Sequence, residues 1–254
     1  MKFPSIQRLL ACAALAFTAH AHAASVTVDS GDTVVIDGVS YTLSGTATFA
    51  YSANQEAAYS LGGITTSGIE GATYDATANT TTTEIASFTV DSSSGAISGV
   101  ATTGGENDSA SAGLLLTGGS LNVVNLTWDE ATSTIYADVS DSTGSVASIT
   151  QLALFTVSTV TGSTTVTGEG SFTSVLSGIY LTTAGLDYIT EVLGLGSLAQ
   201  SVIASTDFGT ITATITATAV TAAVPEPSSM ALMLLGLGGV AVAARRKLGD
   251  KTTV

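Results

Sequence analysis

The central part of this chain contains no residue that can carry a positive charge. Between Ala24 and Val224 there is no Lys, Arg, His or Cys, although 18 of the protein's 20 acidic residues lie there. A domain built from these residues forms no side-chain ion pair and no disulfide, so apolar packing and hydrogen bonds must hold it together. The chain is 45% apolar and 10% charged, a composition that favours a packed core over disorder.

The same composition excludes several functional classes from this span. Nucleic-acid binding requires Lys and Arg against the phosphates, and an acidic surface repels both nucleic acid and anionic lipid. A catalytic triad with histidine, a cysteine nucleophile, a Schiff-base lysine and a zinc site of Cys and His all lack their residues. We therefore expect a domain that is not an enzyme and does not bind nucleic acid.

The N-terminal 23 residues have the pattern of a signal peptide. Lys2 and Arg8 flank the start of an apolar run that is too short to span a bilayer, and Ala21 and Ala23 match the small residues of a cleavage site. The pattern predicts export with cleavage after Ala23. A buried first helix and a lipoprotein signal ending at Cys12 are the two alternatives.

The C-terminal region combines a break, an apolar run and a basic cluster. Two prolines at 225 and 227 interrupt regular structure, and residues 230–244 are uncharged. The apolar run predicts a transmembrane helix, and the basic residues after it should stay in the cytoplasm with the body outside.

This region resembles the PEP-CTERM sorting signal of exopolysaccharide-producing Gram-negative bacteria. The residues that carry the resemblance are Val224, Pro225, Glu226 and Pro227, followed by Arg245, Arg246 and Lys247. The resemblance implies transient insertion in the inner membrane, cleavage near the Pro-Glu-Pro sequence by an exosortase, and release or attachment at the cell surface, often in a polysaccharide matrix or biofilm. The chain then divides into a signal peptide (1–23), an exported domain (24–221) and a sorting signal (222–254).

The exported domain is predicted to be mainly β, as a sandwich or an open barrel. Turn residues separate short alternating segments, with an Asp37-Gly38 hairpin, a second hairpin over 128–139, a long strand over 149–160 and a last strand near 211–217. Residues 83–90 break the alternation, because Ile85 is out of step with Phe88. Apolar residues at helical spacing predict one or two short helices near residues 182–204.

Candidate binding residues are few and are all oxygen donors or aromatic. Calcium is the metal that suits such ligands, and Asp29, Asp32 and Asp37 are its candidate site near the mature N-terminus. The segment from Glu106 to Asp108 is also rich in oxygen atoms. Trp128, next to two carboxylates, could stack on a sugar. The simpler interpretations are solvated turn acids and a core tryptophan.

The segment 120–140, followed by 181–185, resembles secreted haem-binding domains of the HtaA type. The resemblance implies a haem ligand, and in a body without histidine it leaves tyrosines such as Tyr136 or Tyr180 as iron ligands.

These observations favour a non-enzymatic exported protein of the cell surface or extracellular matrix. Its acidic surface would associate with extracellular polysaccharide through divalent cations, and no cofactor is expected apart from calcium. The alternative is a secreted ligand-binding module for glycan, calcium or haem. A hydrolase that uses carboxylates alone is the third hypothesis.

Overall fold

The computed structural model describes residues 24–112 and 116–221, and this part of the chain is mainly β. The strands are β1 (Ser25–Asp29), β2 (Thr33–Ile36), β3 (Val39–Tyr51), β4 (Ile64–Ile69), β5 (Thr73–Asp75), β6 (Thr80–Asp91), β7 (Ile97–Thr102), β8 (Gly105–Ala110), β9 (Gly119–Asp129), β10 (Thr134–Asp141), β11 (Ile149–Gly162), β12 (Gly170–Leu181) and β13 (Gly209–Ala219). The helices are α1 (Ala53–Gly62), α2 (Thr183–Leu193) and α3 (Ser197–Ala204).

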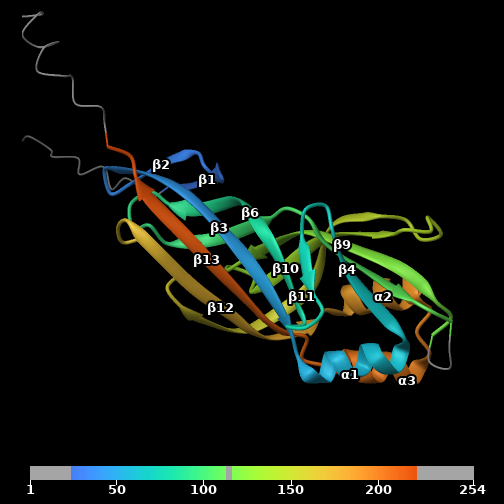
Figure 1. Ribbon diagram of the computed structural model, residues 1–254. Helices are drawn as coiled ribbons and strands as arrows, with labels where there is room; N and C mark the ends of the chain where they lie inside the picture. The colour runs from blue at the N-terminus through green and yellow to red at the C-terminus, as the bar shows by residue number, and fades with distance from the viewer. Residues whose placement is uncertain (1–23, 113–115, 222–254) are drawn as a thin grey trace, which may run out of the picture.

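Eight antiparallel strands form a closed barrel in the order β6-β3-β13-β12-β11-β10-β9-β7 (Figure 1). The ring closes because β7 pairs with β6 on one side and with β9 on the other. The prediction of a mainly β fold is therefore confirmed, and the barrel is closed rather than open. Closure leaves no free edge in the ring, which removes a site for unwanted strand pairing.

Strand β9 pairs with a different strand in each half of its length on one of its two sides. Its first half pairs with β8, which in turn pairs with β4, and its last residues pair with β7. Asn125 lies between the two halves with a φ of 55°, a left-handed conformation that Asn tolerates. The β8–β4 pair therefore extends from the barrel wall towards α1.

The predicted hairpins are confirmed. Asp37 and Gly38 have φ values of 48° and 78° and connect β2 to β3, as expected for a two-residue turn with both central residues left-handed. The second hairpin joins β9 to β10, and the long predicted strand is β11.

The prediction of one or two short helices near 182–204 is also confirmed, since α2 and α3 lie there, and a third helix, α1, was not predicted. Thr182 caps α2 by accepting a hydrogen bond from Gly185 N, and Ser52 caps α1 in the same way from Gln55 N at 3.0 Å. All three helices lie at one end of the barrel (Figure 1). Residue 219, at the end of β13, pairs with Tyr41 at the opposite end, where the Asp37 hairpin lies.

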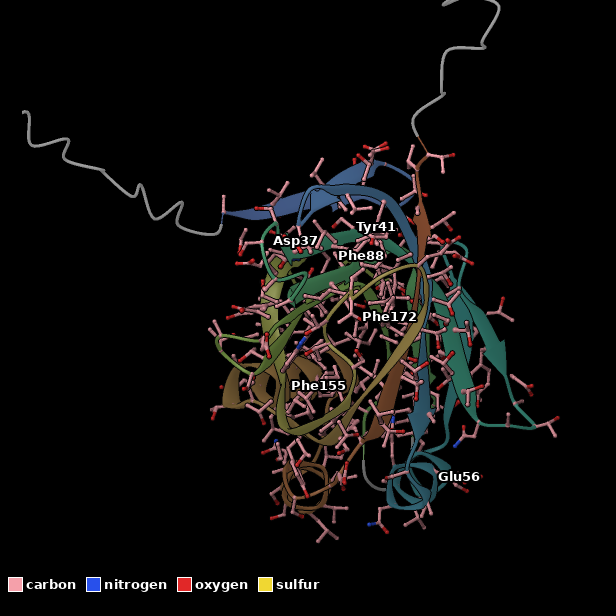
Figure 2. The ribbon with its side chains drawn as sticks, turned by 90° about the vertical axis from the view of Figure 1, so that its left-hand side faces the viewer. Asp37, Tyr41, Glu56, Phe88, Phe155 and Phe172 are labelled. Carbon is pink, nitrogen blue, oxygen red and sulfur yellow. The ribbon has the colours of Figure 1, made fainter. Side chains whose placement is uncertain are left out.

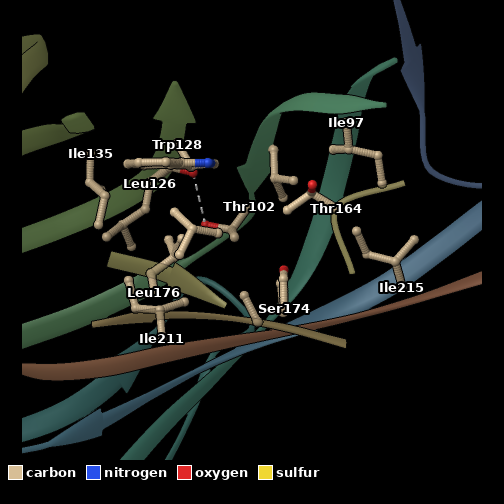
Figure 3. A pocket seen from close by; sticks show the side chains of 14 residues that line it. Ile97, Thr102, Leu126, Trp128, Ile135, Thr164, Ser174, Leu176, Ile211 and Ile215 are labelled. Carbon is tan, nitrogen blue, oxygen red and sulfur yellow. Dashed lines mark hydrogen bonds between the residues drawn. The ribbon is translucent and has the colours of Figure 1, made fainter. Parts of the chain in front are cut away.

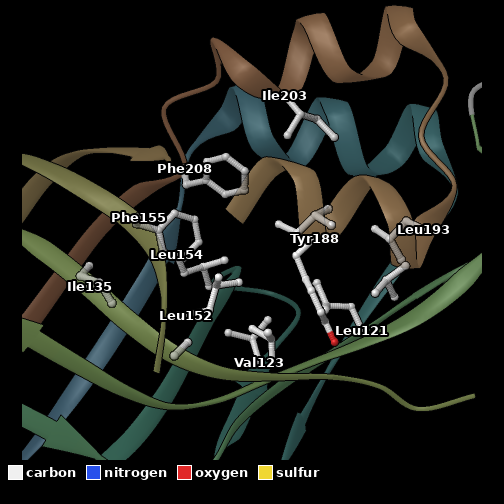
Figure 4. Packing of buried hydrophobic residues seen from close by; sticks show 14 of the residues in the cluster. Leu121, Val123, Ile135, Leu152, Leu154, Phe155, Tyr188, Leu193, Ile203 and Phe208 are labelled. Carbon is white, nitrogen blue, oxygen red and sulfur yellow. The ribbon is translucent and has the colours of Figure 1, made fainter. Parts of the chain in front are cut away.

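The buried apolar residues form two clusters. The helix-end core lies under α2 and α3 and includes Leu154, Phe155, Tyr188 and Phe208 (Figure 4). The hairpin-end core includes Leu43, Ile85, Phe88, Val90 and Ile215 (Figure 2 shows Phe88 beside Tyr41 and Phe155 nearer the helices). Burial of these side chains supplies the main stabilisation of a chain without ion pairs between described residues.

Within the described ranges, no helix is long and apolar enough to cross a membrane. The predicted signal peptide and the predicted transmembrane segment at 230–244 lie outside those ranges.

Candidate functional site

A cavity of about 440 Å³ opens between α1 and strands β4 and β5, at the end of β3. We call it the tyrosine pocket, because three of its lining residues are tyrosines. Its lining residues are Tyr51, Gln55, Glu56, Tyr59, Ser60, Ile64, Thr65, Thr66, Tyr74, Ala76 and Asn79.

Helix α1 contributes much of the lining. Gln55 and Tyr59 are four residues apart and therefore share one face of the helix. The Ser52 hydroxyl both caps the helix and donates to the Asp207 carbonyl oxygen at 2.5 Å, which fixes α1 against the end of the barrel.

Two acidic residues of β8 lie behind the tyrosines. Glu106 and Asp108 are separated by one residue, so both point to the same side of the strand. Gly105 precedes them, and a Cβ atom there would collide with the carbonyl oxygen of Val123 on β9. The glycine thus permits the close strand approach that positions both carboxylates.

Asp108 accepts hydrogen bonds at both of its oxygens. Tyr59 Oη donates to Oδ2 at 2.8 Å, and Thr66 Oγ1 donates to Oδ1 at 2.6 Å. The Asp108 side chain is almost completely buried, with 2% of its surface exposed. Its hydrogen bonds therefore connect α1, β4 and β8 at one point.

Glu106 has a similar set of partners on the barrel side. Tyr51 Oη donates to Glu106 Oε2, and Thr81 Oγ1 donates to the same oxygen at 3.2 Å. The rings of Tyr51 and Tyr74 meet edge to face with centroids 6.1 Å apart. Tyr74 Oη donates to Asn79 Oδ1 at 3.1 Å.

Burial without a counter-charge shifts these groups towards their neutral forms. Burial raises the pKa of Asp108 to about 6, although the hydrogen bonds from Thr66 and Tyr59 oppose the shift. Burial and the charge of Asp108 raise the pKa of Glu106 well above its ordinary range. Burial and then the Asp108 charge also raise the pKa of Tyr59.

Gln55 is the unusual residue of the pocket. Only 2% of its surface is exposed, and its Oε1 has no hydrogen-bond partner among the described residues. A buried acceptor without a donor costs about 1–3 kcal/mol of stability.

The spaces inside the barrel are small and apolar. Two cavities of about 50 Å³ each lie in the barrel interior. Figure 3 shows the first of them, where Trp128 and Leu126 form part of the wall. Each space is too small for a sugar or a haem.

The predicted site residues lie apart from the tyrosine pocket. Asp29 ends β1, Asp32 lies in the following turn, and Asp37 is in the β2–β3 hairpin. Across 24–112 and 116–221, no three acidic side chains come close enough to hold one metal ion. These aspartates therefore do not share a site in this structure, and calcium binding stays a prediction.

The predicted aromatic ligands lie on the barrel wall. Trp128 is partly buried and packs against the helix-end core, although it also lines an outer groove together with Tyr136. Tyr180 is 36% exposed on β12 and lines none of the cavities described above. Neither tyrosine belongs to the tyrosine pocket.

Comparison with known proteins identifies the C-terminal region. Residues 223–247 match the PEP-CTERM protein-sorting motif. The match confirms the resemblance noted above and implies an exported protein that is processed by an exosortase. Val224, Pro225, Glu226, Pro227, Arg245, Arg246 and Lys247 all fall within the matched residues.

No curated protein matches this chain. Among solved structures, the C-terminal domain of HtaA from Corynebacterium glutamicum is similar, with a TM-score of 0.47 and 13% sequence identity. The similarity covers 74% of this chain and all of that domain.

Sequence reasoning noticed Glu106 and Asp108 only as an oxygen-rich segment and missed Tyr51, Gln55 and Tyr59. One signal was available, since Tyr51, Tyr59 and Tyr74 are three of only seven tyrosines and lie close together in the chain. The contacts of Tyr51 and Tyr59 with β8 form only when the barrel folds, so no short stretch of the sequence predicts them.

Proposed function

We propose that this protein is an exported component of the cell surface or extracellular matrix of a Gram-negative bacterium, with a structural or interaction role and no catalytic activity. The observation that carries the proposal is the PEP-CTERM motif at 223–247, which follows directly on the barrel domain. The domain itself has 18 acidic residues and no basic one between Ala24 and Val224. Divalent cations would link this acidic surface to an anionic polysaccharide.

The arrangement of the barrel supports this role. The last strand, β13, ends at the hairpin end, and the tyrosine pocket lies at the helix end (Figure 1). A domain held at the surface through its C-terminal side would therefore direct the pocket away from the attachment point.

The test is the intact mass of the protein in medium, outer-surface and inner-membrane fractions of its native host. We expect an external species that begins at Ala24 and ends between Pro225 and Pro227. An inner-membrane species that still contains Arg245–Lys247 as the final product would contradict exosortase processing.

A second candidate function, a ligand-binding module, is favoured by the tyrosine pocket, a cavity of about 440 Å³ lined by three tyrosines and Glu56. Glycan, calcium and haem are the ligands to test first. A rise in melting temperature with calcium, an oligosaccharide or haemin would support this function, since a ligand that binds only the folded state stabilises it.

A further inference from the structure

The three rings of the tyrosine pocket are held in place by their own hydroxyl groups. The Tyr51 and Tyr59 hydroxyls each donate to a carboxyl group of β8. The Tyr74 hydroxyl donates to Asn79 Oδ1 at 3.1 Å, and the Tyr74 ring meets the Tyr51 ring edge to face. All three tyrosines line the cavity and are only half-buried. The pocket therefore holds aromatic surface that is already in position before a ligand arrives, which lowers the cost of binding.

The polar groups of the pocket include both hydrogen-bond donors and acceptors. Asn79 accepts the Tyr74 proton at Oδ1, so its Nδ2 remains a donor, and Ser60 has a hydroxyl that both donates and accepts. The phenol oxygens keep lone pairs as acceptors, and Glu56 adds an exposed carboxylate. A ligand with several hydroxyl groups matches such a mixed set, because each hydroxyl also donates one hydrogen bond and accepts others.

The pocket offers little charge to a ligand. Glu56 is the only acidic residue among those that line the cavity, and none of the lining residues is basic. Glu106 and Asp108 lie behind the phenols and already accept hydrogen bonds from them, and burial raises the pKa of both. An anionic ligand would therefore have no positive partner, and a cation would meet a single exposed carboxylate. These conditions favour an uncharged ligand.

The apolar part of the lining suits the same class of ligand. A pyranose ring has a face of C–H groups that packs on aromatic rings, while the hydroxyls at the ring edge form hydrogen bonds. Ile64 and Ala76 add aliphatic surface to the lining. The cavity of about 440 Å³ also falls within the usual size of small-molecule sites, about 300–1,000 Å³.

We propose that the tyrosine pocket binds a neutral sugar. The C–H face of a pyranose ring packs against Tyr74, one of its hydroxyls accepts from Asn79 Nδ2, and another donates to Glu56. This inference rests on the ligand-binding function proposed above and selects one of its ligand classes.

Haem and calcium fit the pocket less well. A tyrosine ligates haem iron as the phenolate, and burial raises the pKa of Tyr59 and Tyr74, which disfavours that form. Haem also carries two propionates, for which the lining supplies no basic partner. Calcium takes about 6–8 oxygen ligands, commonly with several carboxylates, whereas the lining supplies only Glu56.

The experiment is calorimetric titration of the full-length chain, purified in mild detergent, with four tetrasaccharides. Cellotetraose, mannotetraose and galactotetraose are neutral, and tetragalacturonate carries a carboxylate on each ring. We expect at least one neutral tetrasaccharide to bind and tetragalacturonate not to bind. Binding of tetragalacturonate with equal or higher affinity would contradict a site for neutral sugars.

Tyr74→Ala tests the site itself, because it removes aromatic surface without a change of charge. We expect at least roughly tenfold weaker sugar binding, as for truncation of an aromatic anchor. Tyr74→Phe keeps the ring and should recover most of the lost affinity. A structural role alone would lower the melting temperature of Tyr74→Ala but leave the affinity of the folded protein unchanged.

Glu56→Ala is a second variant of the site that should fold normally, because Glu56 is exposed on α1 and alanine favours helix. We expect it to weaken sugar binding several-fold. Glu191→Ala on the exposed side of α2 is its charge-matched control and should leave the affinity unchanged.

Tyr136→Ala is the matched control for Tyr74→Ala. Tyr136 is also half-buried but lines the outer groove of the barrel wall, so its removal should leave sugar binding intact. Loss of binding in Tyr136→Ala but not in Tyr74→Ala would place the sugar in that groove and overturn the proposal. Unchanged affinity in both Tyr74→Ala and Glu56→Ala would also overturn it.

Titration of the same preparation with haemin and with calcium separates this proposal from the function on which it rests. Binding of either one without sugar binding overturns the sugar site but leaves the ligand-binding function standing. No binding of any probe would contradict both.

Discussion

The two ends of this barrel differ in the kinds of side chain that they bury. The hairpin end is filled by apolar side chains such as Leu43, Phe88 and Val90, each with no measurable exposure. The helix end has an apolar core of its own but also holds Asp108 and Gln55, at 2% exposure each. The same chain therefore contains one end optimised for packing and one end that retains costly polar burial.

The difference identifies the helix end as the part of the barrel where buried polar groups reduce stability. An ionisable group that is buried without a cation destabilises the folded state, and so does an acceptor without a donor. Burial of Asp108 and of the Gln55 Oε1 acceptor therefore lowers stability at the helix end. Three predictions test this contrast.

The largest effect is expected at the hairpin end. Phe88→Ala should lower the free energy of unfolding by about 3–5 kcal/mol, because it leaves a cavity in a fully buried position. Urea denaturation monitored by circular dichroism measures the change. Val35→Ala on neighbouring β2, where the side chain is 52% exposed, should stay within about 0.5 kcal/mol. Equal losses in the two variants would contradict the packing described for this end.

A smaller effect is expected from Asp108. Burial of this side chain lowers stability at neutral pH, whereas burial of Phe88 raises it. Burial raises its pKa to about 6 from an ordinary value of 3.8, so the folded state holds this proton more tightly than the unfolded state does. The protonated Asp108 carboxyl makes its full contribution to stability below pH 4, and this contribution is lost as the pH rises through 6. Asp108→Asn should therefore make the decline of the urea midpoint between pH 4 and pH 7 shallower.

Asp187→Asn on the exposed face of α2 is the charge-matched control for Asp108→Asn. It also removes one negative charge, so the difference between the two variants isolates the effect of burial. An identical pH dependence in both variants would show that Asp108 is solvated.

The smallest effect should be the same at both ends. Asp91 closes the turn after β6 and Asp141 the turn after β10, and hydrogen bonds from the following turn residues lower the pKa of each to about 2. Such a carboxylate stabilises the fold above its unfolded pKa, and this contribution is lost as the pH falls towards 2. Asp91→Asn and Asp141→Asn should each reduce the loss of stability on acidification from pH 4 to pH 2. A clear difference between them would mean that the two ends also differ in their turns.

Local patterns predicted much of the fold, because local chemistry determines those elements. The Asp37-Gly38 turn needs two left-handed residues, and α2 and α3 follow from apolar spacing. Helix α1 was missed because its sequence, Ala-Asn-Gln-Glu-Ala-Ala-Tyr-Ser-Leu-Gly, lacks a clear apolar stripe. Its caps, Ser52 and Gly63, define it instead.

The irregular alternation in 83–90 has a tertiary explanation. The register between β6 and β7 shifts between Ile85 and Ser87, and this bulge returns both Ile85 and Phe88 to the interior. The sequence of β6 shows only that the alternation of apolar residues fails. The bulge that compensates for this failure depends on how β6 pairs with β7, which the sequence of one strand does not show.

The sequence by itself determined the export and sorting of this protein, its β class and the absence of basic residues between Ala24 and Val224. Contiguous residues and composition encode these properties. Only the tertiary structure decided that β7 closes the barrel and that Tyr59 of α1 meets Asp108 of β8. Those contacts join residues far apart in the chain, and their energies depend on burial, which is a property of the assembled fold.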